Sequence, residues 1–102
     1  MPFVYLLRCA DESLYCGWST DLEARLAKHA DGTGARYTAT RRPVALAAAW
    51  ETETKTQARS LEGQIKRLSA RQKRDLVAGT PVHELMTLKD PVHPVRVRRT
   101  PA

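Results

Sequence analysis

The sequence predicts a small single α/β domain, in which a three-stranded sheet is flanked by helices in the order β-β-α-β-α-α and followed by a basic C-terminal tail. The length of 102 residues suits one domain, because single domains commonly have about 100 to 150 residues. Short β-prone runs alternate with segments in which apolar residues recur every three or four positions, which is the pattern of strands alternating with helices. Serine or threonine precedes each of these periodic segments, as is typical of helix starts.

The chain begins with a predicted β-hairpin, formed by residues 3–9 and 13–17. If residues 10–12 form a three-residue loop, Leu7 faces Tyr15, and Tyr5 becomes a diagonal neighbour of Tyr15 on the same face. A loop of two or four residues would place the tyrosines on opposite faces, because strand side chains alternate. The register therefore decides whether these tyrosines share a site.

A helix and a loop are predicted next. Thr20 and Glu23 have the spacing of a capping box, which predicts a helix that runs to about Ala30 and ends at Gly32. Residues 36–43 show no periodicity and are predicted to form a loop.

The apolar residues 44–50 indicate a buried strand, although their alanines leave a helix possible. Capping boxes at Thr54 and Ser69 predict two further helices, the second of which ends at Gly79. The buried face of the first of these helices is predicted to carry Ala58, Leu61, Ile65 and Leu68. We expect residues 1–80 to form the domain and residues 81–102 a C-terminal extension, which is basic, rich in proline and largely unstructured from residue 89 onward.

The charge of the chain points to a polyanionic partner. The formal net charge is +6, and residues 59–74 contain six basic side chains with Glu62 as the one acidic residue among them. Such a surface suits nucleic acid, because phosphates release counterions when cations replace them. A solvated helix face that keeps a small protein soluble is the alternative.

Composition also limits the cellular setting. Cys9 and Cys16 have neither the number nor the spacing of a disulfide framework or a zinc site, so we expect reduced packing residues. No apolar run approaches the roughly 18 residues of a membrane span, and residues 1–10 do not have the pattern of a signal peptide. We therefore expect a cytoplasmic protein without a membrane partner.

Several polar residues lie at positions from which they could line a cleft. Arg25 and His29 are four residues apart and thus share one helix face, and Glu62 lies at the edge of an apolar stripe. Ordinary structural roles remain open for each of them. Arg25 could pair with Asp21, Glu62 could pair with Lys66, and a histidine near a helix C-terminus could simply favour the helix dipole.

Taken in order, these residues resemble a known family. Its two signature elements correspond to Phe3-Val4-Tyr5 and Tyr15-Cys16-Gly17, and its helix arginine and histidine correspond to Arg25 and His29. A further tyrosine corresponds to Tyr37 in Gly34-Ala35-Arg36-Tyr37-Thr38, and the metal-binding glutamate corresponds to Glu62. Over about residues 3–77 the chain resembles the GIY-YIG nuclease superfamily, and most closely its small single-domain subgroup. It departs from the pattern at Phe3-Val4 and Cys16, in having Trp18-Ser19-Thr20 where some members have a lysine, and in lacking asparagine altogether.

The resemblance implies a metal-dependent endonuclease that hydrolyses phosphodiester bonds in nucleic acid, with DNA favoured. It implies one Mg²⁺ or Mn²⁺ ion at Glu62, and Arg25 on the phosphate. We expect Tyr5 to act as the general base, with Tyr15 and Tyr37 positioning water and phosphate and His29 accepting the proton onward. These six side chains should converge on one concave face.

Binding is expected from basic residues outside this group. They are Arg36, Arg41, Arg42, Lys66, Arg67, Arg71, Lys73 and Arg74, together with the tail arginines Arg96, Arg98 and Arg99. Two other functions stay open. One is a nucleic-acid-binding module of the same fold without turnover, and the other is a small interaction protein with a basic docking face.

Overall fold

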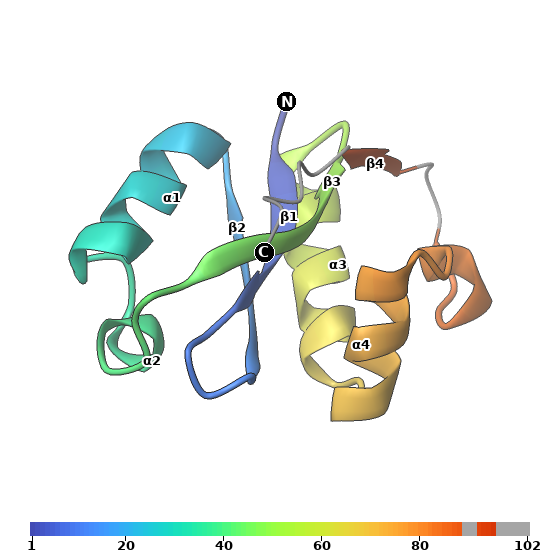
Figure 1. Ribbon diagram of the computed structural model, residues 1–102. Coiled ribbons are helices and arrows are strands. Elements are labelled where there is room, and N and C mark those ends of the chain that lie inside the picture. Colours follow the sequence, from blue (N-terminus) through green and yellow to red (C-terminus); the bar gives the residue numbers. More distant parts are fainter. Residues whose placement is uncertain (89–91, 96–102) are drawn as a thin grey trace.

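The computed structural model describes residues 1–88 and 92–95. Its sheet has four antiparallel strands in the order β2-β1-β3-β4 (Figure 1). The strands are β1 (Phe3–Arg8), β2 (Leu14–Ser19), β3 (Ala45–Glu51) and β4 (His93–Val95). Along the chain, the predicted hairpin, helix, strand and two further helices occur in the predicted sequence, with additional elements between and after them, and β3 is a strand rather than a helix.

The prediction of three strands is wrong, because β4 pairs with Ala49, Trp50 and Glu51 of β3. This strand is only three residues long and contains Pro94, so it has no β-prone run that a sequence pattern could reveal. Proline is tolerated there because β4 is an edge strand. The other residues of the predicted tail, 89–91 and 96–102 with their three arginines, lie outside the described residues.

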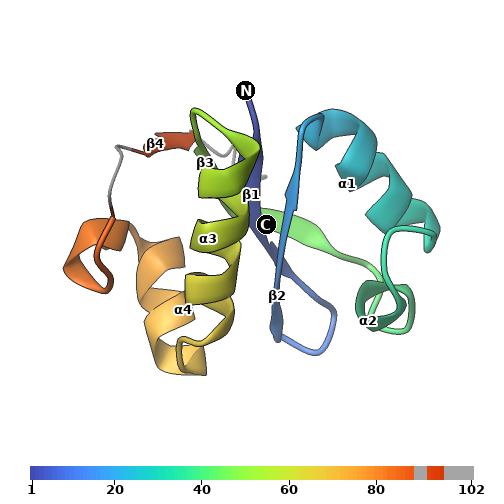
Figure 2. The same cartoon turned by 180° about the vertical axis from the view of Figure 1, so that it is seen from behind.

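Helices cover both faces of the sheet (Figures 1 and 2). Helices α1 (Leu22–Asp31) and α2 (Arg36–Ala39) lie on one side, and α3 (Lys55–Lys66) and α4 (Ala70–Ala78) lie on the other. A short 3₁₀ helix, η1 (Val82–Glu84), follows α4. Within the part of the chain that the structure describes, no helix has the length and apolar character needed to cross a membrane.

The hairpin has the register of the three-residue loop. Leu7 faces Tyr15, Tyr5 faces Gly17, and the amide of Cys9 donates to the carbonyl of Ser13 at 2.9 Å. Tyr5 and Tyr15 consequently lie on the same face of the sheet, the face covered by α1 and α2. The expectation that the two signature tyrosines are same-face neighbours is confirmed.

The helix ends agree with the prediction at four positions and differ at one, and one predicted loop contains a short helix. Gly32 and Gly79 end α1 and α4 with φ values of 91° and 114°, and Ser69 forms the full capping box with Gln72. Thr54 caps α3 by accepting from the amide of Gln57. The cap predicted at Thr20 is wrong, because Asp21 takes that position and its carboxylate accepts from the amide of Ala24 at 3.1 Å. The loop predicted for residues 36–43 is wrong in part, since Arg36–Ala39 forms one helical turn that is too short to show periodicity.

The two faces of the sheet have unequal cores. The α3 and α4 side holds the larger one, whose buried side chains include Val4, Leu6, Trp50, Leu61, Ile65 and Leu76. On the α1 and α2 side the buried apolar cluster is smaller, and it consists of Tyr5, Leu7 and Ala49 with half-buried neighbours around them. Cys9 and Cys16 are free and buried. The smaller core leaves room on the α1 side for buried polar groups.

Candidate active site

A chain of hydrogen-bonded side chains lies between the sheet and helices α1 and α2. The Tyr5 hydroxyl lies 2.8 Å from Nε2 of His29, and Nδ1 of His29 lies 2.8 Å from the Thr38 hydroxyl. The Thr38 hydroxyl in turn donates to the carbonyl of Ala35 at 3.2 Å. All three side chains are fully buried, at 0% exposure. Because buried polar groups need partners, each of the three depends on the others.

The segment after α1 wraps closely around His29. The amides of Thr33 and Gly34 both donate to the carbonyl of Lys28, one residue before the histidine. A Cβ at position 34 would lie 2.6 Å from Nδ1 of His29, so only glycine fits there. This close approach brings α2, which carries Thr38, to the outer nitrogen of the ring.

Two further aromatic rings reach from the buried histidine to the surface. The Tyr15 ring meets His29 edge-on with centroids 5.4 Å apart, and the Tyr37 ring stacks on Tyr15 with centroids 5.7 Å apart. Tyr15 is half-buried, whereas Tyr37 is 37% exposed. Of the three candidate tyrosines, Tyr37 and Tyr15 are therefore the ones that a ligand can reach, while Tyr5 lies below the surface.

Arg25 supplies positive charge beside the hydrogen-bonded Tyr5 and His29 side chains. Burial raises the pKa of Tyr5 above its ordinary value, and the nearby Arg25 guanidinium partly opposes that rise. Burial and the Arg25 charge both lower the pKa of His29, so the imidazole is neutral at pH 7. Nε of Arg25 is buried and has no hydrogen-bond partner within the described ranges. An anionic oxygen would satisfy this donor.

Glu62 does not share the face on which the other five candidates meet. It lies on α3, which covers the opposite face because Leu61 and Ile65 pack into the larger core. The expectation that all six residues converge on one face is therefore wrong for Glu62. Its carboxylate is half-buried and lies 3.4 Å from Nζ of Lys66.

Strand β2 nevertheless lies next to both Glu62 and the residues on the α1 side. Its Tyr15 lies on the α1 side, and its Cys16 lies on the α3 side, where the thiol is 4.0 Å from the carbonyl oxygen of Glu62. Burial, with a smaller contribution from the Glu62 charge, raises the pKa of Cys16 to about 12. Strand β2 is the edge strand of the sheet, with Tyr15 on its α1 side and the backbone of Glu62 next to it on its α3 side.

The donor set around Glu62 suits one weakly held hard cation. Glu62 is the single acidic residue of α3. Across residues 1–88 and 92–95 there is no group of three or more His, Cys, Asp or Glu side chains able to hold a metal ion. Mg²⁺ commonly keeps several waters and binds through one or two carboxylates together with substrate phosphates. A single carboxylate therefore fits such an ion, provided that the ion pair between Glu62 and Lys66 opens.

The basic candidates lie on both sides of the sheet. Arg36, Arg41 and Arg42 belong to α2 and the residues after it, and Lys66, Arg67, Arg71, Lys73 and Arg74 belong to α3, α4 and the turn between them. Lys73 and Arg74 line a shallow hollow of about 360 Å³ together with Tyr37 and hairpin residues 11–14. This hollow connects the exposed Tyr37 ring to the basic helix α4.

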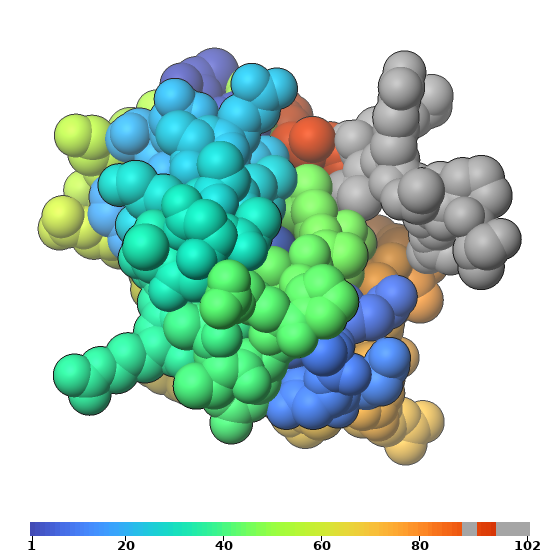
Figure 3. Space-filling view, turned by 60° about the vertical axis from the view of Figure 1, so that its left-hand side comes forward, coloured from blue at the N-terminus to red at the C-terminus, as the bar shows by residue number. Residues whose placement is uncertain are grey.

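Arg41 is not a free cation, because the tip of the hairpin holds it. Its Nε lies 3.0 Å from a carboxylate oxygen of Asp11, and its guanidinium lies 3.8 Å from the centroid of the Tyr37 ring. The amide of Ala10 also donates to the carbonyl of Arg41 at 2.9 Å. In Figure 3 the hairpin, in blue, accordingly lies beside the green segment that follows α2.

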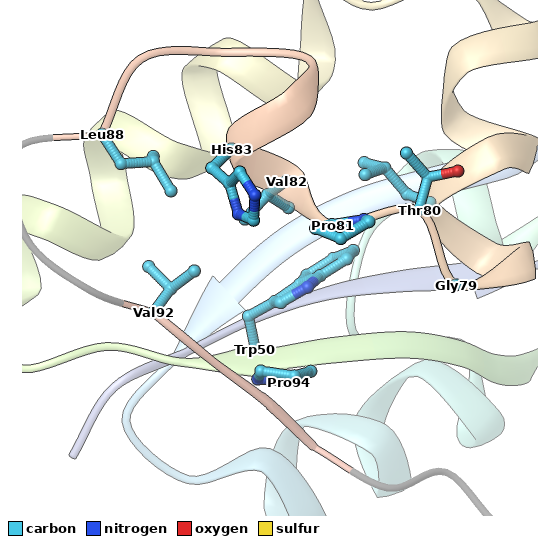
Figure 4. A pocket seen from close by; sticks show the side chains of 10 residues that line it. Trp50, Gly79, Thr80, Pro81, Val82, His83, Leu88, Val92 and Pro94 are labelled. Atoms are coloured by element: carbon cyan, nitrogen blue, oxygen red, sulfur yellow. The ribbon is translucent and has the colours of Figure 1, made fainter.

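A larger hollow of about 580 Å³ lies between α4, η1 and β4 (Figure 4). Its walls are mostly apolar, with Trp50, Val82 and Val92 around the cavity. It contains none of the candidate catalytic residues and no lysine or arginine. It is therefore separate from the site on the α1 side.

Thr38 was not among the residues singled out from the sequence, and neither was the contact between Asp11 and Arg41. Thr38 directly follows Tyr37, but the one-turn helix that presents it has no recognisable pattern. The residues of the second pair are 30 positions apart. No local signal indicates either contact.

Comparison with known proteins gives the family of the chain and a solved structure of similar fold. Residues 1–75 match the GIY-YIG catalytic domain. A UPF0213 protein of Lactococcus lactis subsp. cremoris is 50% identical over 72 residues, which cover 71% of this chain and 74% of the relative. UPF0213 protein CPE1444 of Clostridium perfringens is 44% identical over 84 residues, which cover 82% of this chain and 90% of the relative. The solution NMR structure of UPF0213 protein BH0048 from Bacillus halodurans has a TM-score of 0.52 and 40% identity, covering 89% of this chain and 100% of that one.

Proposed function

The chain belongs to the GIY-YIG catalytic domain family, and we propose that it is a metal-dependent endonuclease that hydrolyses phosphodiester bonds in nucleic acid, with DNA as the favoured substrate. The observation that carries this proposal is Arg25, whose buried Nε has no partner in the described structure although it lies beside the Tyr5 and His29 pair. A phosphate oxygen would satisfy that donor. A cytoplasmic location is part of this proposal.

The proposal gives the three tyrosines different roles, which their different exposure supports. Tyr37 and Tyr15 reach the surface and would contact the incoming phosphate and water. Tyr5 would act as the general base by passing its proton to Nε2 of His29, which is 2.8 Å away. Because Tyr5 is fully buried, water reaches its hydroxyl only after the side chains around it move.

Charge in the transition state would be stabilised from both sides of the β2 edge. Arg25 can present its guanidinium to the phosphate oxygens, and it favours the phenolate form of Tyr5. Glu62 would hold one Mg²⁺ or Mn²⁺ ion with water and phosphate oxygens as the remaining ligands, and that ion would supply charge for the leaving oxygen. A phosphodiester lying along the edge of β2 would then be within reach of both groups.

A second candidate function is a nucleic-acid-binding module without turnover. The complete burial of Tyr5, His29 and Thr38 favours it, because a satisfied buried network also serves a purely structural role. Under this alternative the basic helices would bind nucleic acid, and the hydrogen-bonded chain would only hold α1 and α2 on the sheet.

A cleavage panel separates the two functions. Single-stranded, nicked, branched and duplex DNA and RNA would be incubated with the wild-type protein and Mg²⁺ or Mn²⁺, and binding would be measured in parallel. The nuclease predicts metal-dependent products from at least one substrate, whereas binding without products under both metals would establish the module. The variant Glu62→Gln should abolish cleavage and leave affinity nearly intact, and the exposed Glu84→Gln serves as the control. Full cleavage by Glu62→Gln would refute the metal assignment.

A further inference from the structure

The Thr38 hydroxyl has two hydrogen-bond partners, Nδ1 of His29 and the carbonyl of Ala35. A hydroxyl has one hydrogen to donate and can accept through its lone pairs. The Thr38 oxygen lies 2.8 Å from Nδ1 of His29 and 3.2 Å from the carbonyl oxygen of Ala35. In the bond to Ala35 the hydroxyl donates its one hydrogen, because a carbonyl only accepts, and no hydrogen is left for Nδ1. The hydroxyl oxygen must then accept a hydrogen from Nδ1.

The hydrogen bond between Tyr5 and His29 leads to the same assignment of the proton to Nδ1. A neutral imidazole has one N–H, so a proton on Nδ1 leaves Nε2 as an acceptor for the Tyr5 hydroxyl. In the opposite tautomer, Nε2 would donate to Tyr5. The phenol hydrogen of Tyr5 would then have no acceptor among the hydrogen bonds of the described residues, because the nearby Arg25 can only donate. A buried donor without a partner is costly, which disfavours that arrangement.

Thr38 is held rigidly with respect to His29. The amide of Arg41 donates to the Thr38 carbonyl at 3.1 Å, and the amide of Ala39 donates to the Ala35 carbonyl at 3.0 Å. At the start of this segment, the amide of Gly34 donates a hydrogen bond to the carbonyl of Lys28 in α1 at 3.0 Å. Both ends of the segment are thus fixed, and the hydroxyl cannot follow a ring that changes its tautomer without losing the bond to Ala35.

We infer that Thr38 is a positioning residue that holds His29 in the tautomer with the proton on Nδ1, so that Nε2 receives the proton of Tyr5. This inference rests on the proposed function only for its catalytic consequence. In the proton transfer the O–H bond of Tyr5 breaks and an Nε2–H bond forms. The products are a phenolate beside Arg25 and an imidazolium whose Nδ1–H remains bonded to Thr38.

Nitrogen NMR tests the tautomer without any assay of activity. In protein labelled with ¹⁵N, the shifts of the two ring nitrogens distinguish the tautomers directly. We expect the wild-type protein and Thr38→Ser to show the proton on Nδ1, and the nearly isosteric Thr38→Val to show an increased fraction on Nε2. The exposed Thr20→Val is the matched control and should resemble the wild type. A wild-type proton on Nε2, or an unchanged tautomer in Thr38→Val, would overturn the inference.

Kinetics then test the catalytic consequence. Removing the outer hydrogen-bond partner of a metal-bound histidine typically costs about 10-fold to 100-fold, and we use the same range for His29. We expect Thr38→Val to lower kcat by such a factor with little change in KM and to alter the pH profile, while Thr38→Ser restores both. If Thr38→Val does not fold, the wild-type spectrum and Thr38→Ser still decide the tautomer. If no protein cleaves any substrate, the proposed function fails while the tautomer result stands by itself.

Discussion

Gly17 lies directly across the β1 and β2 ladder from Tyr5, and a Cβ at position 17 would be 2.5 Å from the Tyr5 hydroxyl oxygen and 2.7 Å from Cζ. Glycine is needed here for space rather than for an unusual backbone angle. We expect Gly17→Ala to displace the Tyr5 ring from His29, because the ring is fully buried and cannot move outward freely. Overpacking of this kind costs about 1–3 kcal/mol, which urea unfolding would measure.

Gly63 provides the matched control for that substitution. It lies within α3, and a Cβ there would have no heavy atom within 4 Å. Glycine inside a helix is less favourable than alanine by roughly 0.5–1 kcal/mol, so Gly63→Ala should increase the free energy of unfolding by up to that amount. If Gly17→Ala were as stable as Gly63→Ala, the close approach of Gly17 to Tyr5 would be wrong.

Stability should fall on acidification because of His29. Burial and Arg25 lower the pKa of this histidine in the folded state, so between its folded and unfolded pKa values the unfolded chain binds more protons. The stabilisation is therefore fully present above the unfolded pKa of about 6.5 and is lost as pH falls toward the folded pKa. Urea midpoints measured from pH 7.5 to pH 5 should decrease for the wild-type protein.

The variant His29→Gln isolates this effect. Glutamine does not titrate, so its unfolding midpoint should depend less on pH over the same range, although the variant is less stable at pH 7.5. His83 and His93 are exposed and unchanged in both proteins, so a difference between the two proteins points to position 29. Equal pH dependence in the two proteins would exclude His29 as the source.

The parts of this structure that were predictable are those that local geometry decides. The same-face arrangement of Tyr5 and Tyr15 follows from the length of the hairpin loop, and the end of α1 at Gly32 follows from a left-handed residue. The layer that holds Glu62 was not predictable in this way. Periodicity shows which face of α3 is apolar, but it does not show on which side of the sheet that helix packs.

Contacts between distant residues explain the remaining differences. Strand β4 forms only because β3 offers a free edge more than forty residues earlier in the chain, and its Pro94 argues against a strand. Thr38 binds His29 through a one-turn helix that has no pattern of its own. Such contacts depend on the assembled fold, so a pattern in one segment cannot reveal them.

Releasing Arg41 should strengthen the binding of nucleic acid. Asp11 holds the Arg41 guanidinium at 3.0 Å, and Asp11→Asn would remove the charge while keeping the size of the side chain. Each phosphate that a cation neutralises contributes about −0.9 to the slope of log affinity against log salt on duplex DNA. We expect Asp11→Asn to raise the affinity and to steepen that slope by up to about one, as measured by fluorescence anisotropy at several salt concentrations.

Glu12→Gln is the control for net charge. Glu12 is the neighbouring acidic residue, and its contact is with Arg8 at 4.0 Å rather than with Arg41. Both variants raise the net charge of the protein by the same amount. Equal effects of the two substitutions would show that only overall charge matters and that the contact between Asp11 and Arg41 does not restrain binding.

We expect residues of α4 to contribute to nucleic-acid binding and Arg25 of α1 to contribute to catalysis. Lys73 and Arg74 line the hollow beside Tyr37, so replacing both by alanine should weaken binding similarly for all sequences and make the salt slope shallower by up to about two. Saturating substrate should restore the cleavage rate, because such contacts hold ground state and transition state equally.

The pair Lys28→Ala and Lys55→Ala removes the same charge from exposed positions elsewhere and should change the slope less. Arg25→Ala should instead lower the rate at any substrate concentration. If the α4 pair and its control shift the slope equally, the hollow beside Tyr37 does not bind phosphate and α4 is only a solvated basic face.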